Sequence, residues 1–216
     1  MTWKKPTTGI ILAAGMSTRF GKPKQLLRLK GKYLIEWVLD AVLNSHLENI
    51  ILVLGYKNRE IFEAISEKAY HPALQVVVND RFSEGLSQSL LAGLRMVQKT
   101  FPSVMFLLGD QPMVDSRMIN HLLDRFWESD KDICVPTFQE KRGNPTIFSR
   151  NLYNQLLDIK GDVGARNIIK EHPDSVLYVE VKDPLYFYDI DTEEDLTRIK
   201  RKSEYRNSKI ETNPKF

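Results

Sequence analysis

Short, nearly continuous apolar runs alternate with longer amphipathic segments along this chain, and this alternation limits its fold more than any other feature. The apolar runs lie at residues 9–13, 50–54, 74–78, 104–108 and 133–136. Apolar residues at helical spacing mark the segments between these runs, at residues 33–44, 58–68, 85–99 and 115–128. Strands that are apolar on both faces and separated by helices are typical of a parallel sheet covered on each side. The sequence therefore predicts an α/β fold.

The second half of the chain keeps this rhythm less regularly. We expect further strands at residues 146–148, 176–181 and 186–190, and further helices at 150–157, 165–171 and 192–202. Because no repeat, low-complexity tract or linker interrupts the chain, the pattern predicts one domain over residues 1–202, with a mixed and mostly parallel sheet. Residues 203–216 are polar and are expected to form a disordered C-terminal tail.

Composition restricts the class of protein. The chain has 216 residues, of which 42% are hydrophobic, and this suffices for one well-buried α/β domain. The net charge of +3 comes from interspersed charges and a basic run near the C-terminus, without the dense basic patch typical of nucleic-acid-binding proteins. No apolar run reaches the ~18 residues of a membrane span, and no signal peptide precedes the first strand. We therefore expect a cytoplasmic protein that binds neither nucleic acid nor membrane.

The single cysteine and the histidines give no indication of catalysis. Cys134 has no partner for an internal disulfide, which fits a reducing compartment. Its apolar strand indicates a buried hydrophobic side chain and not a nucleophile. The four histidines lack metal-ligand spacing. Loop residues of other types must therefore carry the chemistry.

Ligands of open α/β sheets bind beyond the carboxyl ends of the strands. The segments that follow the predicted strands hold most of the glycines, and they lie at residues 14–24, 55–59, 79–85, 109–115 and 137–145. We expect several of these segments to converge on one cleft.

The first of these segments, in 11-ILAAGMSTRFGKPKQLL-27, combines a tight corner with positive charge. Gly15 lets a ligand approach the backbone, and successive N–H groups in such a loop form an anion cradle. Ser17 adds a hydroxyl, Arg19 a planar guanidinium suited to phosphate, and Lys24 a mobile charge. The dinucleotide and Walker patterns are absent. The loop is therefore interpreted as a phosphate site of another kind, with a solvated surface loop as the alternative.

Two acidic motifs are candidates for a metal site. In 106-FLLGDQPMV-114, Asp110 stands at the tip of a strand, while Asp115 is better placed to cap the following helix. In 186-YFYDIDTEEDL-196, Asp189 and Asp191 would point to the same face of a strand. Asp110 and Asp191 would suit Mg²⁺, which prefers one or two carboxylates plus phosphate oxygens and water. The alternative is that Asp191 or Thr192 only caps the last helix.

A third motif, 83-SEGLSQSLLAGL-94, opens a helix with small residues. The free N–H groups of the helix start and the hydroxyls of Ser87 and Ser89 could read a base edge or bind an anion. Ordinary capping by Ser83 or Ser87 is the alternative.

Two weaker motifs, 142-RGNPTIF-148 and 161-GDVGAR-166, form a rigid turn and an anion-friendly loop. They are expected to face a second substrate, with ordinary surface turns as the alternative.

The order of all these motifs along the chain points to a family. From about residue 9 to residue 196 the chain reads L-A-A-G-M-S-x-R-F-G-x-x-K-x-L, E-G-L-S-x-S-L, G-D-Q-P, G-N-P-x-x-F, G-D-x-G-A-R and D-I-D-T-x-E-D-L. This order resembles the MobA-like nucleotidyltransferases, and among them most closely the molybdenum cofactor cytidylyltransferases. The resemblance implies a Rossmann-like three-layer α/β/α fold with a mixed, mostly parallel sheet of about seven strands. It also implies transfer of CMP from CTP to the phosphate of the molybdenum cofactor (molybdopterin), with release of pyrophosphate and Mg²⁺ as cofactor.

The resemblance implies roles for individual residues as well. The catalytic groups would be Arg19, Lys24 and Asp110, and the metal ligands would be Asp110 and Asp191. The nucleotide would contact Leu12, Ala13, Ala14, Gly15, Ser17, Arg19, Lys24, Asn79, Gly85, Ser89 and Asp110. The second substrate would contact Gln111, Pro112, Gly143, Asn144, Pro145, Asp162 and Arg166. Ala14 favours cytidine, because relatives that use GTP tend to have glycine there.

Three alternatives remain open. The acceptor could be another molecule, such as a sugar phosphate or methylerythritol phosphate, or the donor could be GTP. A non-catalytic carrier of the cofactor would not need both Asp110 and Asp191. For an enzyme, transient contact with a recipient molybdoenzyme or its chaperone is a further expectation.

Overall fold

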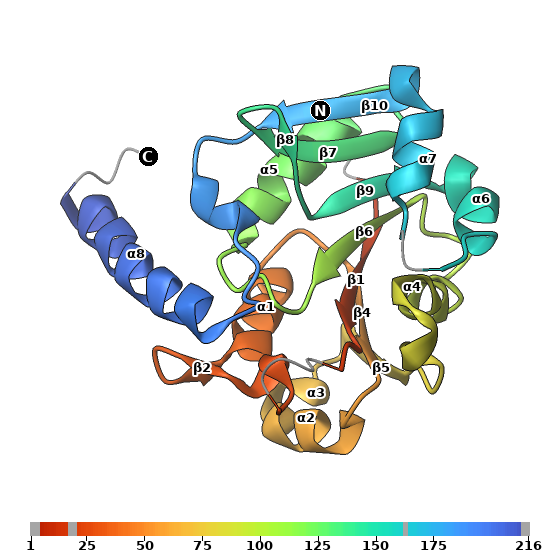
Figure 1. Ribbon diagram of the computed structural model, residues 1–216. Coiled ribbons are helices and arrows are strands. Elements are labelled where there is room, and N and C mark those ends of the chain that lie inside the picture. Colours follow the sequence, from red (N-terminus) through yellow and green to blue (C-terminus); the bar gives the residue numbers. More distant parts are fainter. Residues whose placement is uncertain (1–4, 17–20, 162–163, 213–216) are drawn as a thin grey trace.

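A mixed sheet forms the centre of the molecule (Figure 1). The computed structural model describes residues 5–16, 21–161 and 164–212. Its main sheet has eight strands in the order β10-β7-β9-β6-β1-β4-β5, with β8 paired to β7. The strands are β1 (Thr7–Ala13), β4 (Asn49–Leu54), β5 (Leu74–Val78), β6 (Ser103–Leu108), β7 (Ile133–Phe138), β8 (Lys141–Arg142), β9 (Thr146–Ser149) and β10 (Val176–Glu180).

The pairing of the strands confirms the predicted mixed and mostly parallel sheet. Strand β1 pairs in parallel with β4 and β6, β4 with β5, and β10 with β7. Strand β9 runs antiparallel to both β6 and β7. The carboxyl ends of β1, β4, β5 and β6 therefore meet at one edge of the sheet, where the sequence predicts a ligand.

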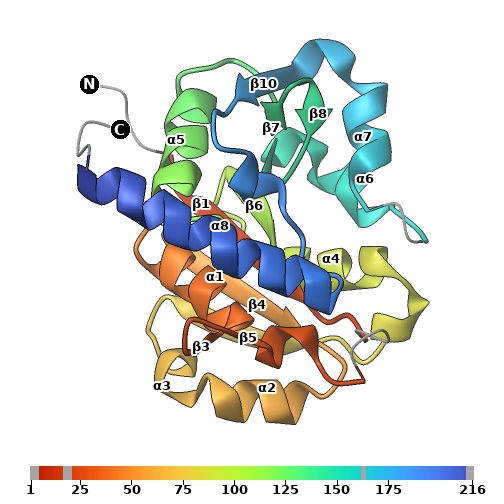
Figure 2. The same cartoon turned by 60° about the vertical axis from the view of Figure 1, so that its left-hand side comes forward.

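Helices cover both faces of the sheet, which makes three layers (Figures 1 and 2). The helices are α1 (Leu34–Leu43), α2 (Asn58–Ala64), α3 (Ser66–Ala69), α4 (Leu86–Leu94), α5 (Ser116–Trp127), α6 (Tyr153–Leu157), α7 (Arg166–Glu171) and α8 (Glu193–Thr212). The short 3₁₀ helices are η2 (Lys24–Leu26), η3 (Phe82–Glu84), η4 (Arg150–Leu152), η5 (Pro173–Ser175) and η6 (Pro184–Phe187).

Strand β1 shows how the sequence builds the two buried layers. Successive strand residues point to opposite faces. Ile11 and Ala13 join the hydrophobic cluster with α1 and α5, whereas Ile10 and Leu12 join the cluster with α4, α6 and α7. Because both faces of β1 are covered, the run is apolar at every position, as the sequence analysis assumed. Cys134 is fully buried in β7, which confirms that it is a core residue.

One strand predicted from sequence is wrong. Residues 184–187 form the 3₁₀ helix η6, and the described residues 188–190 belong to no strand. Pro184 sits in the first turn of η6, and the Asp183 carboxylate accepts the Leu185 N–H at 2.9 Å. These two local features favour a turn over an extended start. Asp189 and Asp191 therefore do not share one face of a strand.

Several other elements differ from the prediction in their bounds. The helix predicted over residues 58–68 is divided at Ile65 into α2 and α3. Helix α8 continues past residue 202, its predicted end, to Thr212, so part of the expected tail is helical. Leu196 and Ile199 attach the start of α8 to a third hydrophobic cluster with Leu29 and Leu34. The division into a domain over residues 1–202 and a tail stays a prediction.

Two short hairpins were not predicted. Strands β2 (Arg28–Leu29) and β3 (Lys32–Tyr33) form a separate two-stranded sheet, and β8 turns back on β7. Both turns contain non-glycine residues with positive φ, such as Lys30 and Glu140, at 49° and 66°. Their sequences lack the Asn-Gly or Asp-Gly signature of a two-residue turn.

None of the helices in the described ranges is long and apolar enough to cross a membrane.

Candidate active site

The loops after β1 and β6 lie side by side at the carboxyl edge of the sheet. Leu12 pairs with Leu108 in register, and the Gly109 N–H donates to the Leu12 carbonyl at 3.0 Å. Asp110 therefore stands next to the end of β1, close to the loop that the sequence identified as a phosphate site. These two segments therefore lie together, as the sequence predicts, and the cleft itself stays a prediction.

Lys24 joins this pair of loops to a third, distant segment. Its ammonium donates to the Asp110 carboxylate and also to Asp191 Oδ1, the latter at 3.1 Å. The side chains of Lys24 and Asp110 are 19% and 15% exposed, while that of Asp191 is 51% exposed. One cation thus sits between two carboxylates, one largely buried and one facing solvent.

The two carboxylates raise the pKa of the Lys24 ammonium. Burial by itself lowers the pKa of the Lys24 ammonium, but the charge of Asp110 and its hydrogen bond, followed by those of Asp191, raise it. The net pKa lies above the ordinary value of 10.5. Lys24 is therefore a fixed positive charge at neutral pH.

The carboxylate of Asp191 is not the cap of helix α8. The Asp195 carboxylate accepts the Thr192 N–H at 2.9 Å, and the Thr192 hydroxyl accepts the Asp195 N–H at 3.1 Å. This reciprocal pair is a capping box and satisfies the helix start. The hydrogen bond with Thr192 is the main cause of the lowered pKa of Asp195. The side chain of Asp191 binds Lys24 instead, so the capping alternative holds for Thr192 and not for Asp191.

Gln111 ties the segment before α8 to the loop after β6. Its Nε2 donates to Asp189 Oδ1 at 2.6 Å, and the Ile190 N–H donates to the Asp110 carbonyl at 3.3 Å. Gln111 is 4% exposed, and its Oε1 has no hydrogen-bond partner within the part of the chain that the structure describes. Burial, followed by the charge of Asp110, raises the pKa of Asp189. A polar acceptor and a partly desolvated carboxyl therefore lie beside the Lys24 cluster.

These residues fit a divalent cation. Among the described residues, no three His, Cys, Asp or Glu side chains form a metal-binding group. Asp110 and Asp191 instead form a pair of carboxylates whose two negative charges Lys24 balances only in part. Carboxylate oxygens suit Mg²⁺ or Mn²⁺, and a site with two of them takes its other ligands from phosphate and water.

The end of β1 is fixed by hydrogen bonds from two sides. Gln25 Nε2 donates to the Ala13 carbonyl at 2.8 Å, and the Tyr56 N–H donates to the Ala14 carbonyl at 3.2 Å. Leu12, Ala13 and Ala14 are buried, and Gly15 is exposed. The backbone predicted to lie against the nucleotide is therefore held in one conformation up to Gly15.

Two predicted residues of this loop, Ser17 and Arg19, lie outside the described residues. Their roles in binding and catalysis stay predictions.

Gly55 is a site residue that the sequence analysis did not single out. A Cβ at Gly55 would lie 2.8 Å from the Ala14 Cβ and 2.6 Å from the Phe82 Cβ. Only glycine allows the turn after β4 to approach the Ala14 loop this closely. The segment 55–59 had been identified as a loop at the right edge, but no local pattern indicated this contact.

The residues predicted for the base meet at the start of α4. Asn79 Nδ2 donates to Ser89 Oγ at 3.1 Å, and both side chains are buried. Gly85 precedes the helix with φ of 104°, and no side chain caps it. The alternative of capping by Ser83 or Ser87 is therefore wrong. The Ser87 hydroxyl is fully buried and, in the described ranges, has no partner.

The loop of residues 161–166 lies against this same helix start. The Ser87 N–H donates to the Gly161 carbonyl at 3.3 Å, and a Cβ at Gly164 would lie 3.2 Å from the Leu86 side chain. Asp162 lies outside the described residues, and Arg166 is the exposed first residue of α7. The described end of this loop is thus next to the residues predicted for the base.

The turn of Gly143, Asn144 and Pro145 lies between β8 and β9. The Gly143 N–H donates to the Pro136 carbonyl at 2.9 Å, and the Asn144–Pro145 bond is cis. Gly143 faces the ring of Phe187, just before the segment that carries Asp189 and Asp191. The turn of residues 143–145, which is predicted to bind the second substrate, therefore contacts Phe187, close in the chain to Asp189 and Asp191.

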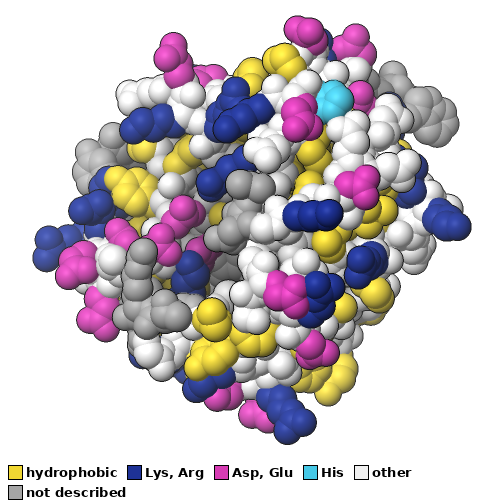
Figure 3. All heavy atoms as spheres, turned by 45° about the vertical axis from the view of Figure 1, so that its right-hand side comes forward, with side chains coloured by type: hydrophobic (Ala, Val, Ile, Leu, Met, Phe, Trp, Pro, Cys, Tyr) yellow, Lys and Arg dark blue, Asp and Glu magenta, His cyan; other side chains and the backbone are white. Residues whose placement is uncertain are grey.

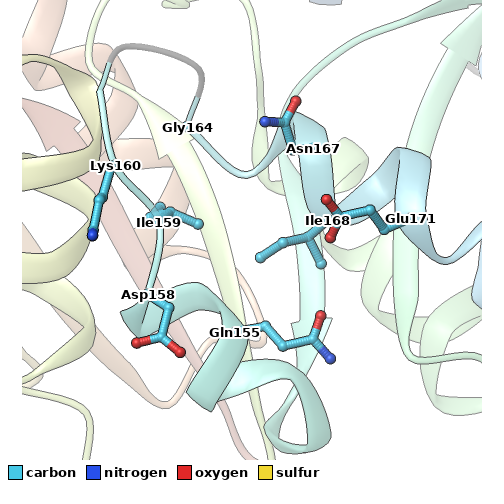
Figure 4. A pocket seen from close by; sticks show the side chains of 8 residues that line it. All are labelled: Gln155, Asp158, Ile159, Lys160, Gly164, Asn167, Ile168 and Glu171. Atoms are coloured by element: carbon cyan, nitrogen blue, oxygen red, sulfur yellow. The ribbon is translucent and has the colours of Figure 1, made fainter.

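A cavity of about 480 Å³ lies elsewhere, between α6 and α7 (Figure 4). Its lining residues are Gln155, Asp158, Ile159, Lys160, Gly164, Asn167, Ile168 and Glu171. None of the cluster residues Lys24, Asp110 and Asp191 lines it.

On the face shown in Figure 3, basic and acidic side chains are interspersed and form no patch of one sign.

Known proteins are similar to this chain over most of its length. The family model of the MobA-like NTP transferase domain matches residues 9–176. Nicotine blue oxidoreductase from Paenarthrobacter nicotinovorans is 28% identical, covering 89% of this chain and 95% of that protein. Purine catabolism protein PucB from Bacillus subtilis is 29% identical with the same coverage, 89% and 95%. A probable molybdenum cofactor guanylyltransferase from Pyrococcus furiosus is 26% identical, again covering 89% and 95%.

Solved structures are similar over almost the whole chain. Rv0371c from Mycobacterium tuberculosis superposes with a TM-score of 0.75 at 30% identity, covering 92% of this chain and 99% of that one. A complex of the same protein with manganese gives 0.72 at 28% identity, covering 91% and 99%. A nucleotidyl transferase from Methanothermobacter gives 0.74 at 25% identity, covering 91% and 96%.

Proposed function

This chain belongs to the MobA-like NTP transferase family, and we propose that it transfers CMP from CTP to the phosphate of the molybdenum cofactor, releasing pyrophosphate. Nucleotidyl transfer itself is the activity of the family. The observation that carries the proposal is the Lys24 ammonium between Asp110 and Asp191, at the edge where the β1 loop ends. Donor and acceptor are both anions, and the Lys24 ammonium together with a divalent cation on the two carboxylates would offer the positive charge that they need.

The reaction requires little covalent chemistry from the protein. An oxygen of the acceptor phosphate attacks the α-phosphorus of CTP and forms a new P–O bond. The bond to the β-phosphate oxygen breaks, and pyrophosphate leaves with the electron pair. Because the attacking phosphate is ionised at neutral pH, no general base is needed. The protein therefore acts by positioning and by electrostatic stabilisation.

Lys24 supplies fixed charge at this point. Its raised pKa keeps the ammonium protonated while the two phosphates approach. An ammonium close to the leaving pyrophosphate stabilises the charge that develops there. Ala13 and Ala14, held by Gln25 and Tyr56, present a rigid edge to the nucleotide.

Asp110 and Asp191 would hold the divalent cation. Bound there, Mg²⁺ would polarise the phosphate oxygens and neutralise part of the charge of the leaving group. The manganese complex of Rv0371c supports a divalent metal in this fold, and Mg²⁺ is our proposal for this chain.

The choice of CTP rests on Ala14, and GTP is the second candidate. Ala14 is buried at the end of β1 against Gly55, and GTP-using relatives tend to have glycine at this position. The name of the Pyrococcus furiosus relative, a guanylyltransferase, favours GTP instead. The proposed acceptor site consists of the loops at Gln111–Pro112 and at Gly143–Pro145.

The test is pyrophosphate release with Mg²⁺, purified molybdenum cofactor and each of CTP, GTP, ATP and UTP. Turnover with CTP alone supports the proposal, and turnover with GTP alone replaces the donor. A panel with a sugar phosphate and methylerythritol phosphate tests the acceptor. Binding of the molybdenum cofactor without turnover on any nucleotide would favour a carrier. The variant Asp110→Asn tests the site itself, because it keeps the size of the side chain and removes its charge.

The proposal includes a cytoplasmic location and a transient contact with a recipient molybdoenzyme or its chaperone. A single, fully buried cysteine fits a reducing compartment.

A further inference from the structure

Gly143 rests directly on the aromatic ring of Phe187. A Cβ at Gly143 would lie 2.2 Å from Phe187 Cε1 and 2.4 Å from Cδ1, far inside van der Waals contact. The Gly143 N–H is held from the other side by the Pro136 carbonyl at 2.9 Å. The backbone of this turn is therefore clamped between β7 and a ring, and no side chain fits at position 143.

The ring of Phe187 has little room to retreat. It lies 6.1 Å from the ring of Phe138, centroid to centroid, with 42° between the planes. It also packs, partly buried, against the hydrophobic cluster that contains Ile11 and Met118. A side chain added at position 143 would therefore displace the ring of Phe187 and, with it, the backbone of residue 187.

Phe187 directly precedes the segment that carries the acidic residues. Within the next four residues, Asp189 binds Gln111 at 2.6 Å and Asp191 binds Lys24 at 3.1 Å. An extended chain of four residues spans at most about 14 Å. The ring that supports Gly143 is thus tied by a short, hydrogen-bonded segment to the candidate metal ligands.

We infer that Phe187 is a positioning residue that sets the place of the acceptor loop, residues 143–145, relative to Asp110 and Asp191. This inference rests on the proposed function, which assigns the acceptor to that loop. In-line transfer needs the attacking oxygen within a few tenths of an ångström of its place, and a displacement of about 1 Å can cost 10²-fold in rate. A rigid ring between the acceptor loop and the metal carboxylates would fix that distance.

The experiment compares Gly143→Ala, Phe187→Ala and the double variant. In Gly143→Ala the new methyl pushes the ring, so the KM for the acceptor should rise about tenfold and kcat should fall. The KM for the nucleotide should change less than about twofold, because Ala14 belongs to the hydrophobic cluster of Ile10 and Leu12, whereas Phe187 packs against the other cluster. In the double variant the methyl occupies space that the ring has left, so turnover should exceed that of Gly143→Ala.

A second readout does not depend on turnover. Amide hydrogen exchange over residues 187–191 should accelerate in Gly143→Ala and return toward the parent rate in the double variant. Phe62→Ala is the control. Phe62 is also a partly buried ring, but it pairs with Tyr70 and is distant from Phe187 in the chain. It should leave the exchange rate of residues 187–191 and the KM for the acceptor unchanged.

The outcomes separate the two claims. Absence of transfer by the parent protein to every acceptor would contradict the proposed function, and the exchange rates would then decide the inference by themselves. Unchanged exchange in Gly143→Ala, or a double variant that shows only the sum of the single effects, would overturn the role of Phe187.

Discussion

The Lys24 ammonium bridges Asp110 and Asp191, two carboxylates that follow it by 86 and 167 residues in the chain. The bridge closes the gap between the loop after β1, the loop after β6 and the start of α8. A divalent cation bound by the same two carboxylates would compete with Lys24 for their charge. In the proposed site, the divalent cation would therefore have to displace Lys24 from the two carboxylates.

Asp110→Asn should lower kcat about 10²-fold, because the variant removes one of the two charges that would hold the metal in the proposed site. The measurement is pyrophosphate release at saturating Mg²⁺ with the preferred nucleotide. Asp174→Asn, at an exposed position in η5, is the control and should keep the parent rate. Parent-level activity in Asp110→Asn would exclude Asp110 from the site.

Lys24→Met should separate metal binding from turnover. Removing the ammonium leaves the two carboxylates without their cation, so Mn²⁺ should bind about tenfold more tightly or better in the absence of nucleotide. Transfer should nevertheless fall about 10²-fold, because the phosphates lose a stabilising charge. Electron paramagnetic resonance titration of Mn²⁺ measures the first effect. The control Lys170→Met, on α7, should change neither quantity, and weaker Mn²⁺ binding in Lys24→Met would contradict the geometry.

Gly55→Ala should destabilise the fold and weaken nucleotide binding together. The new Cβ would lie 2.6 Å from the Phe82 Cβ and 2.8 Å from both Ala14 Cβ and Ala14 O. Overpacking of this kind costs about 1–3 kcal/mol, and it would displace the backbone that faces the nucleotide. Urea unfolding and calorimetric titration with CTP measure the two effects. Tyr56→Phe keeps the backbone N–H that binds Ala14 and should leave both near the parent values.

The stability of the protein should depend on pH through Asp40. This carboxylate on α1 contacts Lys32 at 2.8 Å and Lys68 at 2.7 Å. Burial raises its pKa, but the hydrogen bonds from Lys32 and Lys68 lower it more, so that the net pKa lies below the ordinary 3.8. A carboxyl with a lowered folded-state pKa stabilises the protein above its unfolded-state pKa. That stabilisation is lost as the pH falls through the folded-state value.

Asp40→Asn should therefore lower the free energy of unfolding by about 0.2–1 kcal/mol at pH 7, the usual range for partly exposed ion pairs. The difference from the parent should shrink toward zero as the pH falls below about 4. Urea titrations at pH 7, 5, 4 and 3 measure it. A difference that stays constant over this range would show that the ion pairs do not contribute.

Local patterns were sufficient for much of the molecule. The apolar runs at residues 9–13 and 104–108 form most of β1 and β6, because a strand buried on both faces is mainly apolar. Asp115 caps α5 as expected, since its carboxylate accepts the Met118 N–H at 2.9 Å. Parallel strands present the loops after them at one edge of the sheet, and this rule alone predicted that Asp110 lies beside the loop after β1.

Local patterns failed where a segment had two acceptable conformations. Residues 186–190 are aromatic and alternate in polarity, which suits a strand, yet Pro184 and the Asp183 cap turn the chain into η6. The contacts of Gly55 with Ala14 and of Gly143 with Phe187 had no signal beyond the glycines themselves. The buried Ser87 hydroxyl likewise could not be distinguished from a helix cap.

The sequence by itself thus determined the layers of the fold, the edge at which a ligand is expected and the residue types gathered there, because burial and backbone preference are encoded within a few neighbouring residues. Only the tertiary structure decided that Lys24 bridges Asp110 and Asp191, that Gln111 holds Asp189 and that Phe187 supports Gly143. Such contacts join residues far apart in the chain. They depend on how the helices and loops pack onto the finished sheet, which no short stretch of sequence specifies.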